Sequence, residues 1–221
     1  MKVIIFGATG MVGQGALNAC LRDPEVSQVL LVGRTSTGQT DPRIRELVTP
    51  DLFALGAHAV DLSGYDACFF CLGISSSGMD EASYSRITHD LTLSVAKTLS
   101  QLNPEMSFIY LSGAGADSAE RSRTMWARVR GATENALRRL PFKAVYIFRP
   151  GIIQPLDGIR SKTPSYQFFY SAMGPLLTPL RRLMPKVILT TDVMGRAMIG
   201  AVRRGSPKAV LEAPDIYALS A

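Results

Sequence analysis

Histidine and cysteine are scarce in this sequence, with two and three residues among 221. Three cysteines in a chain of this length do not make a disulfide framework, and two histidines leave too few ligands for a typical zinc site. No segment approaches the roughly 20 consecutive apolar residues that a membrane-spanning helix needs. We therefore expect a soluble, cytoplasmic protein with no metal site and no membrane span.

The chain does have enough apolar residues to bury a core, since 47% are hydrophobic and 19% are charged. The formal net charge of +6 is compatible with a nucleic acid, an acidic surface or a phosphorylated small molecule, and it does not choose among them. Six arginines crowd one expected helix without forming a stripe, and no nucleic-acid motif accompanies them. We expect no nucleic-acid partner. The arginines are Arg121, Arg123, Arg128, Arg130, Arg138 and Arg139.

Short apolar runs alternate along the chain with longer segments of helical period. Runs that are apolar throughout are typical of strands buried on both faces, as in a parallel sheet covered by helices. The alternation therefore predicts an α/β fold, a Rossmann-type doubly wound parallel sheet with strand order 3-2-1-4-5-6. The expected strands are 3–6, 29–32, 57–60, 67–72, 108–111 and 145–148. The expected helices are 11–21, 80–99 and 118–140.

After Pro150 the regular alternation of strand and helix patterns gives way to scattered prolines and apolar clusters. A helix over 191–202 and a short strand over 209–211 are expected there. About 70 residues with so many prolines would not hold a core alone. We therefore predict one domain over 1–221, with 151–221 as a substrate-side extension over the carboxyl edge of the sheet. Arg181 and Arg182, beside Leu176 and Leu177, favour a lid or subunit contact, with a membrane surface as the alternative.

A glycine-rich loop lies directly between the first expected strand and the first helix. Its spacing is G-x-x-G-x-x-G, with glycines at Gly7, Gly10 and Gly13. Such glycines allow a tight turn, let the backbone approach a diphosphate, and expose the N–H groups of the helix start to the anion. No Lys-Ser or Lys-Thr follows Gly13, so the loop is not an ATP-type P-loop. The residues expected to bind cofactor here are Gly7, Thr9, Gly10, Met11, Val12 and Gly13.

The second strand ends in Gly33-Arg34, where an NAD-binding fold usually carries an acidic residue for the ribose 2′-hydroxyl. An arginine suits a 2′-phosphate instead. Arg34 therefore favours NADP over NAD as the cofactor of a single NAD(P)-binding domain.

Other expected cofactor contacts come from the ends of later strands. Asp61-Leu62 follows the expected third strand, where the adenine ring would lie, and Cys71-Leu72-Gly73 ends the fourth, where the cofactor backbone would pass. Pro150 ends the sixth strand and completes this set. Cys68 and Cys71 have the spacing of a redox pair, but residues three apart on a strand point to opposite faces. We therefore expect both thiols to be structural.

These segments resemble the atypical short-chain dehydrogenase/reductases, and most closely the small NAD(P)H-binding branch that includes the mammalian Tat-interacting reductase. The match covers residues 1 to about 155 well and the remainder weakly, and its motifs are specific to the superfamily but not to a substrate. The matching motifs are Gly7–Gly13, Val32-Gly33-Arg34, Cys71-Leu72-Gly73, Ser112–Asp117 and Phe148-Arg149-Pro150-Gly151.

The resemblance also implies where a catalytic site would lie. In that family a Ser or Thr after strand five orients the substrate, a Tyr transfers a proton, and a Lys four residues later binds the nicotinamide ribose. Ser112 matches the first position. Gly131 and Glu134 fix the register of the following helix, so Trp126 replaces the Tyr and Arg130 the Lys. Trp has no titratable proton near neutrality, whereas Arg130 can still hold a ribose hydroxyl.

Another proton donor would therefore be needed, and the sequence does not choose one. The candidates are Ser112, Asp117, Tyr84, His89 and Tyr166.

Two hypotheses share the cofactor site. The first is an NADP-dependent oxidoreductase or epimerase that acts on a small carbonyl or hydroxyl substrate, with Ser112 on the substrate oxygen, Arg130 on the ribose and Trp126 as a wall of the pocket. The second is a non-catalytic module that senses NADP(H) and presents a surface to a protein partner. The sequence is compatible with either a monomer or a homodimer.

Overall fold

A seven-stranded parallel sheet forms the centre of the molecule, with strand order β3-β2-β1-β4-β5-β6-β9. The predicted fold class and order are thus confirmed, and one further strand extends the sheet beyond β6. The computed structural model describes residues 1–156, 158–159, 179–181 and 183–221. The strands of this sheet are β1 (Lys2–Phe6), β2 (Gln28–Gly33), β3 (Ile44–Val48), β4 (Ala67–Phe70), β5 (Ser107–Leu111), β6 (Ala144–Arg149) and β9 (Val210–Glu212).

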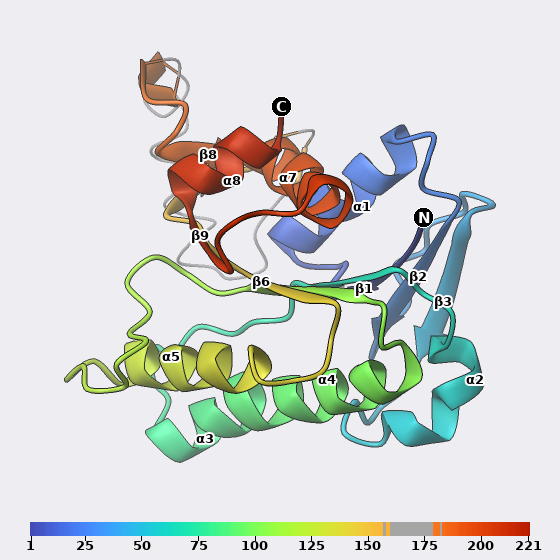
Figure 1. The fold of residues 1–221 in the computed structure, drawn as a ribbon, viewed down its shortest axis with the longest axis horizontal. Helices are drawn as coiled ribbons and strands as arrows, with labels where there is room; N and C mark the ends of the chain where they lie inside the picture. The colour runs from blue at the N-terminus through green and yellow to red at the C-terminus, as the bar shows by residue number, and fades with distance from the viewer. Residues whose placement is uncertain (157, 160–178, 182) are drawn as a thin grey trace.

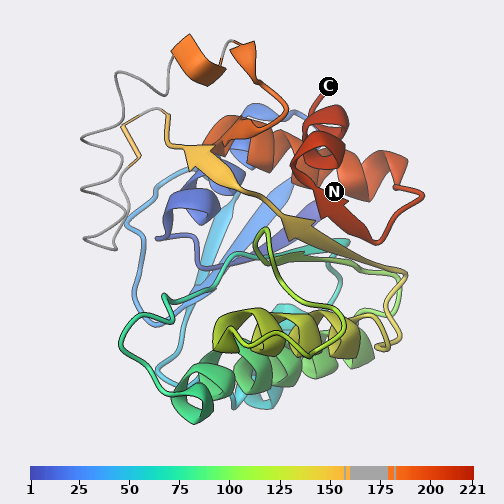
Figure 2. The ribbon, with the colours of Figure 1, turned by 90° about the vertical axis from the view of Figure 1, so that its left-hand side faces the viewer.

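Helices cover both faces of the sheet (Figures 1 and 2). One face carries α1 (Met11–Arg22), α7 (Thr191–Arg204) and α8 (Ala213–Leu219). The other face carries the 3-10 turn η1 (Leu55–His58), α2 (Ala59–Leu62), α3 (Glu81–Ser85), the π-helical turn η2 (Arg86–Asp90), α4 (Leu91–Leu102) and α5 (Met125–Leu137). A separate parallel pair, β7 (Ile152–Gln154) and β8 (Ile188–Thr190), leads into α7.

Successive residues of the central strands enter different cores, which explains why these strands are apolar throughout. Ile5 of β1 packs in the cluster beneath α1 and α7, whereas Ile4 packs in the cluster beneath α4 and α5. The two cysteines of the expected pair divide in the same way. Cys71 belongs to the first cluster and Cys68 to the second. Their predicted separation by the sheet is confirmed, and both thiols are free.

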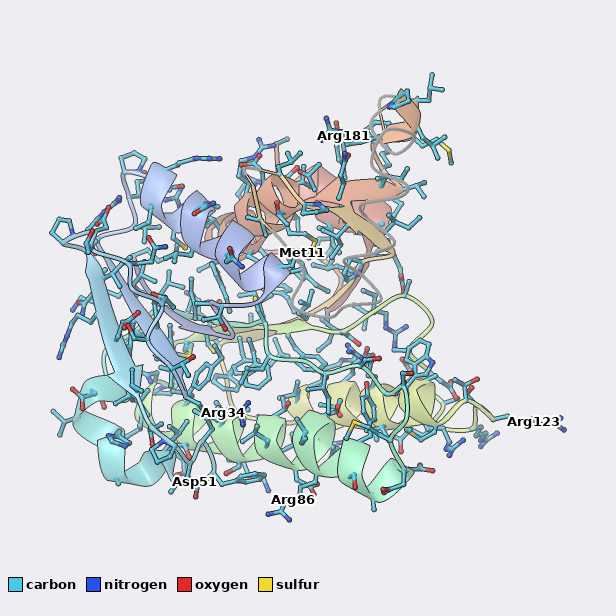
Figure 3. All side chains as sticks on the ribbon, turned by 180° about the vertical axis from the view of Figure 1, so that it is seen from behind. Met11, Arg34, Asp51, Arg86, Arg123 and Arg181 are labelled. Carbon is cyan, nitrogen blue, oxygen red and sulfur yellow. The ribbon has the colours of Figure 1, made fainter. Side chains whose placement is uncertain are left out.

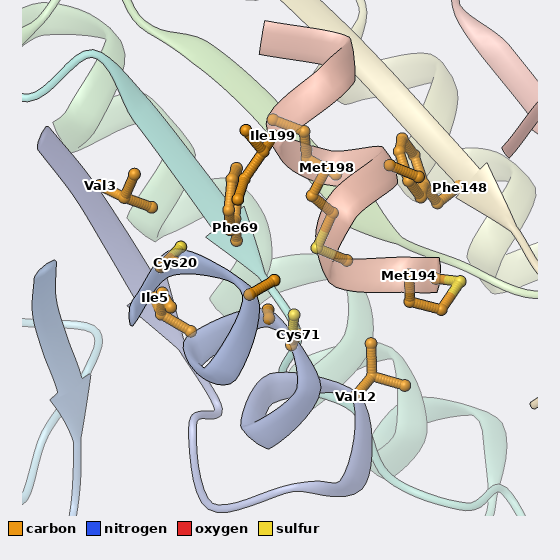
Figure 4. Packing of buried hydrophobic residues seen from close by; sticks show 14 of the residues in the cluster. Val3, Ile5, Val12, Cys20, Phe69, Cys71, Phe148, Met194, Met198 and Ile199 are labelled. Carbon is orange, nitrogen blue, oxygen red and sulfur yellow. The ribbon is translucent and has the colours of Figure 1, made fainter. Parts of the chain in front are cut away.

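Apolar side chains of α1 and α7 pack together over the sheet (Figure 4), and the two helices approach closely because each presents a glycine to the other. A Cβ on Gly15 would lie 2.5 Å from the carbonyl oxygen of Thr191. A Cβ on Gly195 would lie 2.6 Å from both the Gly15 carbonyl oxygen and the Ala19 side chain. Met194, Met198 and other α7 side chains then complete the apolar core over the sheet.

The predicted third strand is wrong in position. Residues 57–60 lie in η1 and α2, and the third strand is β3 at Ile44–Val48. This strand forms an edge of the sheet and is only half-buried, so it carries Arg45 and Glu46 and lacks the apolar run expected of a central strand.

The start of one predicted helix also needs correction, and the C-terminal segment is described only in part. Helix α5 begins at Met125 and not at 118, because Asp117 organises the preceding turn by accepting hydrogen bonds from three backbone N–H groups. The segment after Gly151 was expected over the carboxyl edge of the sheet. Of its described elements, α7 and α8 cover one face, β9 extends the sheet, and β7 pairs with β8; its substrate-side role stays a prediction.

Candidate functional site

In the glycine loop the backbone passes so close to other backbone atoms that Gly7 and Gly13 have no space for a side chain. Gly7 has φ +78°, and a Cβ there would lie 2.8 Å from the backbone of Cys71 at the end of β4. A Cβ on Gly13 would lie 2.1 Å from the Gly7 carbonyl oxygen. The amide of Gly10 donates to that same oxygen at 2.9 Å. No other residue fits at Gly7 or Gly13 without moving the chain.

Helix α1 begins from this loop with its N-terminus open. Gly10 is the N-cap and provides no side-chain cap, and no acidic residue lies in the first turn. Met11 and Val12 are the first helical residues, and Val12 is buried in the core. The side-chain amide of Gln14 donates to the Thr9 carbonyl at 3.2 Å and so links the first turn of α1 to the glycine loop. The helix start therefore presents its N–H dipoles to any anion at the loop.

Arg34 follows β2 on the same edge of the sheet. Met11 and Arg34 are both in view in Figure 3, which looks at the molecule from behind Figure 1. The Arg34 side chain is exposed. Within the part of the chain that the structure describes, it makes no hydrogen bond and no ion pair. Its guanidinium is thus available to a ligand.

Asp61 and Leu62 do not belong to this edge, so their predicted role at the adenine ring is wrong. Both lie in α2, where Asp61 pairs with Arg45 at 3.5 Å and Leu62 is fully buried. The residues that follow the true third strand are Thr49 and Pro50. The prediction failed because it rested on the misplaced strand.

Arg130 of α5 spans the carboxyl ends of β4 and β5. A Cβ on Gly73 would lie 3.8 Å from its Nη2 atom, and a Cβ on Gly113 would lie 4.0 Å from Nη1. Its Nε donates to the Tyr84 hydroxyl at 3.1 Å, and Nη1 donates to the Leu111 carbonyl at 3.4 Å. These bonds fix the guanidinium, and Nη2 faces Gly73 with no hydrogen bond to a described residue. The residue in the Lys position thus supplies a fixed cation where strands β4 and β5 end.

Trp126 lies one turn before Arg130 on α5 and is half-buried. A Cβ on Gly115 would lie 3.3 Å from its indole ring. Gly115 has φ +89° and belongs to the loop after β5. The indole therefore packs on the loop that also carries Ser112.

Ser112 is buried and its hydroxyl is already engaged. It donates to Glu134 Oε1 at 2.5 Å. Arg149 holds the same carboxylate through Nε, at 3.1 Å from Oε1, and through Nη2 on Oε2. Arg149 also donates to Ser118 at 2.6 Å and lies 3.5 Å from Glu212. In the sequence, Glu134 served only to align the helix with the family motif. Its part in holding Ser112 and Arg149 was not predicted.

The other candidate proton donors lie in different environments. Tyr84 is buried against Arg130, whereas Asp117 accepts hydrogen bonds from the backbone of its own turn. Those bonds, first that from the Arg121 amide, lower the pKa of Asp117, so it is ionised at neutral pH. His89 pairs with Asp90 at 2.8 Å. Tyr166, like the Leu176, Leu177 and Arg182 cluster, lies outside the described residues.

The remaining strand-end residues are packed into the fold. Leu72 packs on the cluster beneath α4 and α5, and the Pro150 carbonyl accepts from Ala114 at 3.0 Å. Burial raises the pKa of the Cys71 thiol to about 12, as it does for Cys20. These thiols stay protonated at neutral pH and do not act as nucleophiles.

Two surface hollows are lined by residues outside the predicted cofactor-binding set. One of about 310 Å³ lies where α1 ends beside α7, and there Arg22 pairs with Asp192 and Arg203 with Asp23. The other, of about 340 Å³, lies between α3 and α5 around His89 and Arg128. Among the described residues, no three His, Cys, Asp or Glu side chains gather as a metal site. None of the described helices is long and apolar enough to cross a bilayer.

Solved structures with the same architecture define the class of fold. The Bordetella bronchiseptica enzyme WbmF in complex with NAD⁺ superposes with a TM-score of 0.67 at 14% identity, over 99% of this chain and 76% of that one. UDP-glucuronic acid 4-epimerase from Bacillus cereus, in complex with NAD, gives a TM-score of 0.67 at 13% identity, over 96% and 78%. At such low identity these likenesses show the Rossmann-type fold alone.

Two curated proteins are similar to this chain over most of its length, although no family model matches it. "Protein fmp52, mitochondrial" of Emericella nidulans is 25% identical over 208 residues, which are 90% of this chain and 86% of that protein. Protein HTATIP2 of Rattus norvegicus is 29% identical over 155 residues, 69% of this chain and 62% of that protein. The predicted resemblance to the atypical short-chain dehydrogenase/reductases, in the branch of the Tat-interacting reductase, is confirmed.

One prediction is overturned by the same relatives. The chain was expected to be cytoplasmic because no targeting or spanning segment was recognised. Several fungal relatives, from Emericella nidulans, Aspergillus terreus and Aspergillus oryzae, are named as mitochondrial proteins. A cytoplasmic location is therefore not supported.

Proposed function

We propose that this protein binds a nicotinamide dinucleotide along the carboxyl ends of β1, β2, β4 and β5, with NADP(H) preferred. The observation that carries the proposal is the glycine loop, in which Gly7 and Gly13 leave no room for a Cβ and α1 begins without a cap or an acid. The structural neighbours that share the fold carry NAD. The residues fit a diphosphate at the loop and a ribose hydroxyl at Nη2 of Arg130.

Arg34 supports the preference for NADP(H). Its exposed guanidinium has no partner among the described residues and stands at the end of β2, where a 2′-phosphate would lie. Arginine recognises phosphate through charge and paired N–H donors.

The activity we propose is an oxidoreductase or epimerase reaction on a small carbonyl or hydroxyl substrate. When bound, the nicotinamide supplies or accepts the hydride. Arg130 orients the ribose, Trp126 closes one side of the pocket, and Ser112 presents a hydroxyl whose orientation Glu134 sets.

A sensing function is the second candidate, and two observations favour it. By the register of the family resemblance, Trp126 replaces the proton-donating Tyr, and the Ser112 hydroxyl already donates to Glu134. A protein that only reports the cofactor needs the same binding residues and no proton donor. We expect Trp126→Tyr combined with Arg130→Lys to leave binding intact, and a gain of reductase activity in this double variant would identify a decayed enzyme.

Fluorescence of Trp126, the only tryptophan, tests the cofactor site directly. Titration with NADPH and then NADH should give saturable quenching or energy transfer to the reduced nicotinamide, with NADPH binding more tightly. Arg34→Asp should weaken NADPH binding far more than NADH binding. Equal losses for the two cofactors would refute the role of Arg34, and no response to either would refute the cofactor site.

Cofactor oxidation with a panel of aldehydes, ketones and quinones then separates the two candidate functions. Turnover with any member supports the enzyme. A blank panel, with binding intact, supports the sensor.

A further inference from the structure

In the loop after β2, Ser36 and Thr37 provide hydrogen-bond donors, and all of these donors bind the side chain of Glu46. The amide of Thr37 donates to Glu46 Oε1 at 2.8 Å, and the Thr37 hydroxyl donates to the same oxygen. The Ser36 hydroxyl donates to the other carboxylate oxygen, Oε2. One carboxylate thus receives three donors from two adjacent residues.

The local backbone aims both hydroxyls at this carboxylate. The Gly38 amide donates to Ser36 Oγ at 3.1 Å, and the Gln39 amide donates to Thr37 Oγ1 at 3.4 Å. Gly38 has φ +72°, which permits the turn. Because each hydroxyl oxygen accepts from the backbone, its own proton is free to be donated to an anion. The loop is therefore built to bind a negative group.

Glu46 provides that negative group from the neighbouring strand. Glu46 of β3 is in register with Leu31 of β2, and Leu31 packs on the α1 side of the sheet. Side chains in register on parallel strands point to the same face, so Glu46 lies on the side of the glycine loop. The hydrogen bonds from Ser36 and then Thr37 lower its pKa, and the carboxylate is ionised at neutral pH.

Arg34 lies two residues before Ser36 in the same loop. The same short loop thus carries a cation at Arg34 and hydroxyl and amide donors at Ser36 and Thr37, which are the kinds of group that bind phosphate. The donors of Ser36 and Thr37 are occupied by the Glu46 carboxylate, whereas the Arg34 guanidinium has no partner among the described residues. An incoming 2′-phosphate would have to share them with a like charge or displace it.

We infer that Glu46 is a specificity-determining residue that fills the donors of the 2′-phosphate subsite and thereby limits the preference for NADP(H) that Arg34 confers. The inference rests on the proposed function, because it concerns the choice of cofactor at the same site. Glu46 weakens binding of the 2′-phosphate in two ways: its negative charge repels the phosphate, and its carboxylate accepts the hydrogen bonds of Ser36 and Thr37. The wild-type protein should therefore accept both cofactors, with only a modest preference for the phosphorylated one.

The variant Glu46→Gln tests this, because it keeps an oxygen acceptor and removes the charge. Dissociation constants for NADPH and NADH are measured by nicotinamide fluorescence and energy transfer from Trp126. The ratio of NADPH affinity to NADH affinity should rise by roughly fivefold to tenfold, as expected for removing one charge near a phosphate at a partly solvated site. NADH affinity should stay within about twofold, and the gain should shrink with added salt.

Two matched variants separate charge from loop structure. Glu46→Asp keeps the charge but shortens the reach to Ser36 and Thr37, so it should raise the ratio clearly less than Glu46→Gln does. Glu105→Gln removes an exposed acid just before β5, at the opposite edge of the sheet, and should change neither affinity. Thermal melts of all variants check that the fold is retained.

The outcomes are distinct. An unchanged ratio in Glu46→Gln, an equal loss for both cofactors, or the same rise in Glu46→Asp overturns the inference while wild-type binding stands. Failure of both cofactors to bind wild type and Glu46→Gln alike overturns the proposed function, and this inference with it.

Discussion

The buried carboxylate of Glu134 should be the most sensitive single position for stability near the site. Its side chain is 1% exposed, that of Arg149 is 11% exposed, and the two form a double hydrogen bond at the ends of α5 and β6. Glu134→Gln keeps the shape of the side chain and removes its charge. The Arg149 guanidinium is then left without its buried counter-ion.

The expected magnitude follows from what Arg149 retains. Removing one partner of a buried pair costs about 3–5 kcal/mol of unfolding free energy. Arg149 keeps Ser118 and the half-exposed Glu212, so the low end, about 3 kcal/mol, is expected. At roughly 2–4 °C per kcal/mol for a chain of this size, Tm should fall by about 6–12 °C.

Urea unfolding followed by Trp126 fluorescence, together with thermal melts, measures this effect. Glu212→Gln is the matched control, because it removes the half-exposed charge from the same arginine, keeps an oxygen acceptor for the start of α8, and should cost less than about 1 kcal/mol. A double-mutant cycle of Glu134→Gln with Arg149→Met should show strong coupling. A loss below about 1 kcal/mol for Glu134→Gln, or equal losses in the two Gln variants, would refute the reasoning.

Three further predictions concern other parts of the molecule. Gly195→Ala should lower the free energy of unfolding by about 1–3 kcal/mol, because its Cβ would meet the α1 backbone, whereas Gly56→Ala, in open space, should not; chemical denaturation compares them. Native protein should resist thiol alkylation at pH 8, because burial raises the pKa of Cys20, Cys68 and Cys71; mass spectrometry showing labelling of folded protein would contradict this. The lowered pKa of Asp117 means that its contribution to stability is present above about pH 4 and is lost as pH falls below it, so the stabilities of wild type and Asp117→Asn should converge in acid; melts from pH 7 to 3 test this.

The sheet order and the glycine loop could be predicted because their signals are local. The central strands are apolar on both faces, and the loop joins a strand directly to a helix. Strand β3 escaped prediction because an edge strand is half-solvated and tolerates Arg45 and Glu46. The start of α5 was missed because Asp117 ties up the backbone of a segment whose composition is helical.

The candidate site was predictable only in its outline. The family register placed Trp126 and Arg130 on one helix, but no local pattern indicates that Tyr84 from α3 would fix the guanidinium. The network of Ser112, Glu134 and Arg149 joins residues brought together by the sheet, so sequence spacing carries no sign of it. Contacts of this kind depend on tertiary packing and appear only once the elements are assembled.

The pairing of α1 with α7 has a consequence for how the chain reaches its native state. The partners are separated by most of the sequence, and the ion pair of Asp23 with Arg203 joins residues 180 apart. One apolar face of the sheet therefore stays partly uncovered until the last helices have been synthesised. Such distant contacts slow folding and expose the growing chain to aggregation. Completion of this face should be the late, rate-limiting step of folding, and a nascent chain truncated before residue 191 should be a natural client for chaperones.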